Sequence, residues 1–197
     1  MARLFNAEPD PKLDWPESIW TGEQVPVVVA DEDGARRLTT MAWGLPATAF
    51  FDPVPSKQRG VIYSRDFWRS ATRLGDLALM SRCLILLESF AYPAGQSGQC
   101  TRSWIGLWDR PLAAWAGVCI DGACAGVLIE ANPLVEPLSS TMPRLLTADD
   151  HALWLEGATL LSLGPLFGDD EFYRENLAER WSTGRHDETL PLFGTGA

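Results

Sequence analysis

The chain has 197 residues and a mass of 21.7 kDa, enough for one well-buried core and short for two. Its formal net charge of -10 repels a phosphate backbone, so a nucleic acid would need a local basic patch to bind. No apolar run approaches the roughly 18 residues that a membrane helix needs, and the first residues lack a signal-peptide layout. We therefore expect a single domain over residues 1–197, located in the cytoplasm and without a membrane partner.

The composition offers few cysteine and histidine residues for a metal site or for disulfide bonds. The four cysteines form no Cys-x-x-Cys pair, and His151 and His186 are the two histidines. We expect reduced, buried thiols, no metal site and no cofactor.

The first half of the chain predicts an arm, a hairpin, a helix and a buried strand. Residues 1–20 carry three prolines among acids and are expected to form an arm wrapped on the surface. Two apolar runs at 23–30 and 35–45 flank the turn sequence "DEDG", which is typical of a β-hairpin. Helical spacing over 64–81, with Ser64 as a possible N-cap, predicts a helix. The run "RCLILLESFAY" at 82–92 predicts one buried strand.

The second half predicts a meander, a rigid loop and two helices. Short strands at 101–108, 112–120 and 123–132, separated by turn sequences, indicate an antiparallel meander. Three prolines stiffen the loop 131–146 that follows. Residues 147–155 begin with a capping-box pattern, and Tyr173, Leu177 and Trp181 recur every four residues in 169–181, so both segments are expected to be helices. Residues 184–197 are expected to be a loose tail, and the fold class is α+β with a curled, barrel-like antiparallel core and flanking helices.

Several fragments, in this order, resemble the SOS response-associated peptidase (SRAP) family. They are "WGLP" from Trp43, "YSR" from Tyr63, "RCLI" from Arg82, "LAAWAGV" from Leu112, and "EANPLVEPLSSTMPRLL" from Glu130 followed by "WL". The family patterns are W-G-L-hydrophobic-P, N-A-R-x-E, R-C-L-I-P-x-x-G-F-Y-E-W, A-G-L-W and A-N-P-x-x-x-x-I-H-x-R-M-P. The match spans roughly residues 20 to 160, and the resemblance implies a SRAP-like fold over the whole chain.

The resemblance also implies a reaction. Family members carry a cysteine after the initiator methionine, and its amine and thiol trap the aldehyde of an abasic site in single-stranded DNA as a thiazolidine. An asparagine, a glutamate and a histidine assist, and members are also described as self-processing peptidases. At the matching positions this chain has Ala2, Tyr63, Tyr92 and Ser139. We therefore expect the covalent reaction to be lost, because an alanine amine without sulfur can form only a hydrolysable imine.

Other reactive groups are less favoured by the sequence. Ser139 and Ser140 lack a G-x-S-x-G elbow, and His151 is as easily a surface residue as a base, so we expect loop hydroxyls bonded to their own backbone. Cys83 is expected to be a buried, inert thiol. No catalytic residue is assigned.

The candidate binding residues are Arg65, Arg82, Trp43, Ser139 and Thr141. Arg65 either offers a guanidinium to a phosphate or carboxylate, as the family position implies, or pairs with an acid such as Asp66 or Glu88. For Trp43 core packing is favoured over base stacking, although family members hold splayed bases with such a surface.

Three functions remain open. The first is a noncovalent binding module that engages a protein, or a nucleic-acid strand. The second is a retained SRAP-type peptidase or hydrolase activity. The third is noncovalent recognition of single-stranded or damaged DNA. An acidic or apolar groove would favour a protein partner, and a basic one would favour DNA.

Overall fold

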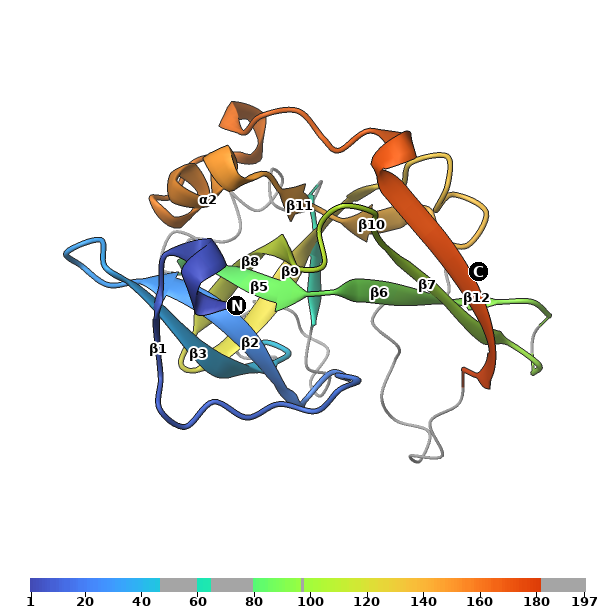
Figure 1. The fold of residues 1–197 in the computed structure, drawn as a ribbon, viewed down its shortest axis with the longest axis horizontal. Coiled ribbons are helices and arrows are strands. Elements are labelled where there is room, and N and C mark those ends of the chain that lie inside the picture. The colour runs from blue at the N-terminus through green and yellow to red at the C-terminus, as the bar shows by residue number, and fades with distance from the viewer. Residues whose placement is uncertain (47–59, 65–79, 97, 182–197) are drawn as a thin grey trace.

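The computed structural model describes residues 1–46, 60–64, 80–96 and 98–181 (Figure 1). Short helices are few, and strands dominate. The helical elements are the 3-10 turns Ala2–Phe5, Leu160–Ser162 and Asp169–Glu171 and the helix α2, Ala148–Leu155. The strands are β1 (Glu8–Pro9), β2 (Gln24–Ala30), β3 (Arg36–Trp43), β4 (Val61–Tyr63), β5 (Ser81–Leu87), β6 (Ser89–Ala94), β7 (Thr101–Leu107), β8 (Ala113–Ile120), β9 (Ala123–Glu130), β10 (Thr141–Pro143), β11 (Leu145–Leu146) and β12 (Phe172–Arg180).

The larger sheet curves into a ring. Antiparallel pairing joins β3 to β2, β2 to β5, β5 to β8 and β8 to β9. A parallel pairing of Trp43 on β3 with Cys124 on β9 then brings the two ends of this path together. The short strands β4 and β10 extend β9 beyond this point, so Tyr63 and the end of the proline-rich loop lie at the same region of the ring.

Alternating side chains of the ring form two cores. Val27, Ile85 and Trp115 belong to the inner cluster, which also packs against the second sheet through Phe90 and Phe172. Their neighbours in sequence point to the outer face, because successive side chains of a strand alternate. The outer cluster holds Val28, Leu84, Leu86, Ala114 and Ala116, and Phe5 and Trp154 complete it from the N-terminal turn and from α2.

The second sheet has the strand order β12-β7-β6 and lies to the right of the ring in Figure 1. A single residue, Glu88, separates β5 of the ring from β6 of this sheet. The predicted single strand over 82–92 is therefore wrong, because the chain passes from one sheet to the other at that residue. The N-terminal arm runs along the end of the larger sheet, where Glu8 and Pro9 pair in parallel with β3.

Two further predictions are wrong in an instructive way. Residues 169–181 are largely the strand β12 rather than a helix, because their backbone pairs with β7 from Phe172 to Arg180. The strand β7 pairs with β6 and β12 and not with β8, so only β8 and β9 of the expected meander form a consecutive hairpin. Both errors concern which strands pair: β12 is held by the distant strand β7, and β7 pairs with β6, the strand before it, in place of β8.

Other predictions are confirmed. The hairpin of β2 and β3 pairs from Gln24 with Ala42 to Ala30 with Arg36, and 147–155 contains α2. The sheet-dominated architecture with few helices is consistent with the α+β class. The expected helix at 64–81 lies, apart from its ends, outside the described residues, as does the tail at 184–197. No described helix has the length and apolarity to span a bilayer.

Candidate functional site

Three residues at the positions implied by the resemblance lie close together. Tyr63 ends β4, Tyr92 lies in β6, and Ser139 belongs to the loop before β10. Tyr92 is fully buried, lies near enough to Tyr63 to interact with it electrostatically, and forms a hydrogen bond with the Ser139 side chain. Its hydroxyl also lies 2.5 Å from the backbone carbonyl oxygen of Thr141, to which it donates. The cluster therefore links the second sheet to β10 on the ring.

This tyrosine cluster is poorly suited to proton transfer near neutrality. Burial raises the pKa of Tyr92 far above its ordinary value, the nearby Tyr63 raises it further, and the hydrogen bond with Ser139 lowers it only in part. The phenol therefore stays protonated and bonded to Thr141. The Ser139 hydroxyl accepts from the backbone N–H of Thr141 at 3.2 Å, which is the local loop bond expected from the sequence.

Ala2 and His151 do not join this cluster. Ala2 lies in the first 3-10 turn and packs against the outer core cluster, and Phe5 of the same turn stacks near His151 with ring centroids 5.2 Å apart. Tyr92 belongs to the inner cluster, on the other face of the larger sheet. The structure thus brings Tyr63, Tyr92 and Ser139 together. It places Ala2 and His151 elsewhere.

Arg82, one of the two candidate arginines, lies apart from the cluster. Arg82 stands on the outer face of β5, where its guanidinium carbon lies 4.5 Å from the centroid of the Trp154 ring in α2. Burial lowers the pKa of Arg82, partly offset by Cys83. Arg65 lies outside the described residues. Arg82 therefore packs beneath α2 instead of facing an open groove.

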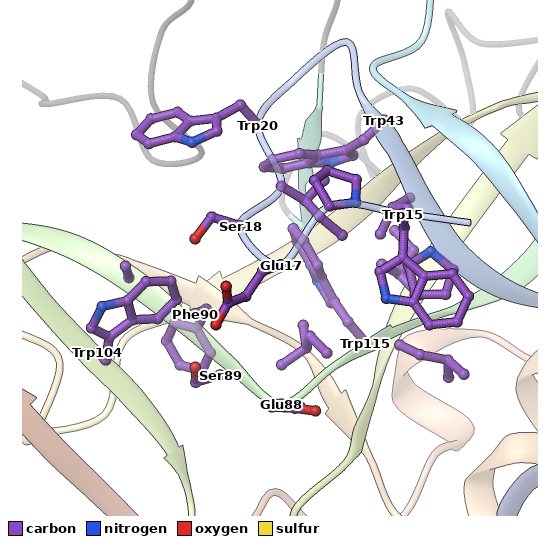
Figure 2. A pocket seen from close by; sticks show the side chains of 18 of the residues that line it. Trp15, Glu17, Ser18, Trp20, Trp43, Glu88, Ser89, Phe90, Trp104 and Trp115 are labelled. Carbon is purple, nitrogen blue, oxygen red and sulfur yellow. The ribbon is translucent and has the colours of Figure 1, made fainter. Parts of the chain in front are cut away.

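A large pocket lies on the other side of the second sheet, between that sheet, the ring and the N-terminal arm (Figure 2). Its volume is about 600 Å³. Aromatic side chains from six separate segments line it: Trp15 and Trp20 from the arm, Trp43 from β3, Phe90 from β6, Trp104 from β7, Trp115 from β8, and Trp181 after β12. We call it the tryptophan pocket. Trp43, the first residue of the "WGLP" motif, is thus both a core residue and part of a pocket wall.

The wall formed by Trp43 and Trp115 is rigid. Both rings are buried, and they meet edge to face with centroids 6.2 Å apart. The indole nitrogen of Trp43 donates to the Gly60 carbonyl and that of Trp115 donates to the Val127 carbonyl, each at 2.7 Å. By contrast, Trp15, Trp20 and Trp104 are only half-buried, so they can offer ring surface to a ligand.

The charges at the pocket are mainly negative. Among the described residues that line it, Glu17, Glu88 and Glu179 are acidic, and Arg102 is the arginine. Arg102 is buried, lies 3.2 Å from the Glu179 carboxylate, and is placed over the Trp20 ring at 5.4 Å from its centroid. In Figure 2 the carboxylate of Glu17 extends between Trp104 and Trp115, and Glu88 lies below it. An aromatic, acidic cavity favours apolar or cationic groups over phosphates.

The sequence did not identify Trp15, Trp20 or Trp104 as site residues. One signal was available, because Trp15 and Trp20 occur in a proline-rich arm, where a core residue is unusual. The convergence of these six segments depends on the sheet pairing and could not be seen in a single sequence.

The thiols contribute no reactive group to the tyrosine cluster or to the tryptophan pocket. Cys83, Cys119 and Cys124 are buried inside the ring, and Cys100 is half-buried in the loop before β7. Hydrogen bonds with Cys119 and Cys124, together with burial, raise the pKa of Cys83 well above its ordinary value. Within the part of the chain that the structure describes, no three histidine, cysteine or acidic side chains are grouped to hold a metal ion.

Comparison with known proteins shows the fold alone. No family model matches the chain, and neither does any curated protein. A protein from Bordetella bronchiseptica aligns with a TM-score of 0.72 at 15% identity, covering 90% of this chain and 93% of that one. A phage-related protein from the same organism aligns at 0.59 and 16% identity, covering 92% and 91%. A protein from Bacteroides thetaiotaomicron aligns at 0.57 and 16% identity, covering 80% and 75%. The chain therefore shares its overall fold with bacterial proteins of very different sequence.

Proposed function

We propose that this chain is a diverged SRAP-like protein that has lost the covalent trapping of abasic sites and binds a partner protein noncovalently through the tryptophan pocket. The observation that carries the proposal is the pocket itself, in which half-buried rings accompany a rigid wall of Trp43 and Trp115. Large aromatic rings left accessible in a cavity are typical of binding surfaces, since elsewhere their burial is favoured.

The tyrosine cluster supports the loss of chemistry. A thiazolidine needs an amine and a thiol on one residue, and Ala2 carries no sulfur and packs on the outer face. The positions that match the family's assisting groups hold Tyr63, Tyr92 and Ser139, and Tyr92 is held protonated. A hydrolase built on Ser139 is equally unsupported, because His151 lies with Phe5 on the outer face.

The charge of the pocket favours a protein over DNA. Among the described residues, three glutamates line it, and the guanidinium of Arg102 is paired with Glu179. Stacked bases would suit the tryptophan rings, but their phosphates would lie near carboxylates.

Two measurements test the proposal. In the first, the protein is mixed with single-stranded DNA that contains an abasic site and analysed on a denaturing gel with and without borohydride. We expect no crosslink without reductant, and a stable band there would refute the loss of covalent chemistry.

In the second, tryptophan fluorescence is titrated with a pool of random hexapeptides and with oligothymidine at physiological salt. We expect the peptide pool to bind the wild type and Trp108→Ala but not Trp104→Ala. Trp108 is the matched control, because it is 68% exposed and lies outside the pocket. Equal binding by both variants, or binding by oligothymidine alone, would contradict the proposal.

A further inference from the structure

The tryptophan pocket contains acidic groups that the protein itself does not neutralise. Glu17 and Glu88 are exposed, and neither forms an ion pair with any residue in the described ranges. The pocket's arginine cannot serve them both, because Arg102 is buried against Trp20 and paired with Glu179. The carboxylate of Glu17 lies among the rings, as Figure 2 shows.

Such an arrangement has a defined electrostatic preference. The face of an indole ring carries negative charge density, and a cation within about 6 Å of its centroid is attracted to it. Carboxylates beside the rings add a second attraction and can accept hydrogen bonds from the same cation. Arg102 already demonstrates this geometry within the pocket, with its guanidinium over Trp20 and beside Glu179.

Building on the function proposed above, we propose that the tryptophan pocket receives an arginine or lysine side chain of the partner protein, held between the indole rings and the carboxylates of Glu17 and Glu88. The aliphatic stem of such a side chain would contact the apolar wall, and its charged end would meet the carboxylates. Arginine fits better than lysine, because a planar guanidinium both stacks on an indole and binds a carboxylate through two N–H groups.

The neighbouring strand supports a protein segment as the carrier of this cation. Leu177 and Glu179 of β12 line the pocket, and β12 is an edge strand of its sheet in the described part of the chain. Seven of its nine residues are exposed. An edge strand presents unpaired backbone N–H and C=O groups, to which an extended segment can add as a further strand. A partner that binds there would reach the pocket with its side chains.

The test uses three matched peptides that are identical except at one central position, which is arginine, norleucine or glutamate. Binding is followed by tryptophan fluorescence and by calorimetry with the full-length protein. We expect the arginine peptide to bind at least about tenfold more tightly than the norleucine peptide, and the glutamate peptide to bind worst. Glu17→Gln with Glu88→Gln should remove most of this preference.

The control is Glu8→Gln with Glu136→Gln, which removes the same charge from exposed positions outside the pocket. It should keep the preference. If the arginine and norleucine peptides bind equally well, and Trp104→Ala abolishes the binding of both, the cation inference is overturned while the proposed function stays intact. Absence of binding by all three peptides would overturn both.

Discussion

Trp43 and Trp115 meet edge to face inside the ring of strands, with their ring planes inclined by 69° and each indole nitrogen bonded to a backbone carbonyl. The contact joins β3 to β8 across the inner core and forms one wall of the tryptophan pocket. Its geometry depends on space that β9 leaves open, because a Cβ at Gly126 would overlap the Trp115 ring.

Gly126→Ala should therefore destabilise the fold. The added methyl group must displace the Trp115 ring or the backbone of β9, and overpacking of this kind costs about 1–3 kcal/mol. Urea unfolding followed by circular dichroism measures the change. Glu130→Ala, an exposed substitution in the same strand, should change the free energy of unfolding by less than about 0.5 kcal/mol. Similar free energies of unfolding for the two variants would show that the Trp115 side chain can move aside freely.

Asp150→Ala should destabilise the protein by about 3–5 kcal/mol, because it leaves a buried charge without its partner. The Asp150 carboxylate lies 3.8 Å from the Arg144 guanidinium, both side chains are buried, and it also accepts from the Gly164 N–H at 2.7 Å. Asp149→Ala, on the exposed side of the same turn, should cost less than about 1 kcal/mol. The milder Asp150→Asn keeps an acceptor and provides a measurable intermediate if the alanine variant does not fold. Equal stability of the Asp149 and Asp150 variants would exclude a structural role for the pair.

His151 should make stability fall in mildly acidic solution. Burial, with Arg36 nearby, lowers the pKa of this imidazole from 6.5 in the folded state, although a backbone hydrogen bond at Leu146 and the Asp150 charge oppose the shift. The unfolded chain therefore binds the proton more readily. The contribution of neutral His151 to folding stability is fully present above pH 6.5, and it is lost as the pH falls toward the lower pKa of the folded state. Between pH 7 and pH 5 the wild type should lose more stability than His151→Gln, and parallel profiles would disprove this assignment.

The thiols should react in two groups with Ellman's reagent. Cys100 is half-buried and its thiol donates to the Gln96 carbonyl at the surface, so it should react first. The three cysteines inside the ring of strands should react at least about a hundredfold more slowly, because the structure must open before the reagent reaches them. Cys100→Ser should remove the fast phase, and all four thiols should react at once in denaturant. A fast phase of more than one thiol would place Cys119 or another core thiol within reach of solvent.

Local features of the sequence determined several elements. The apolar runs on either side of "DEDG" form the hairpin of β2 and β3, because both strands and their turn are adjacent in the chain. The capping pattern at Thr147 likewise precedes α2, and the Thr147 hydroxyl donates to the Asp150 carboxylate at 3.0 Å.

Tertiary structure alone decided the rest. Tyr173 and Leu177 are four residues apart, a spacing that places side chains on one face of a helix and equally on one face of a strand, since four is a multiple of two. Pairing with β7, some 70 residues away in the chain, selected the strand. The tryptophan pocket follows from the same kind of long-range pairing, because Trp20, Trp43 and Trp104 share no local pattern and meet only where the arm, the ring and the second sheet pack together.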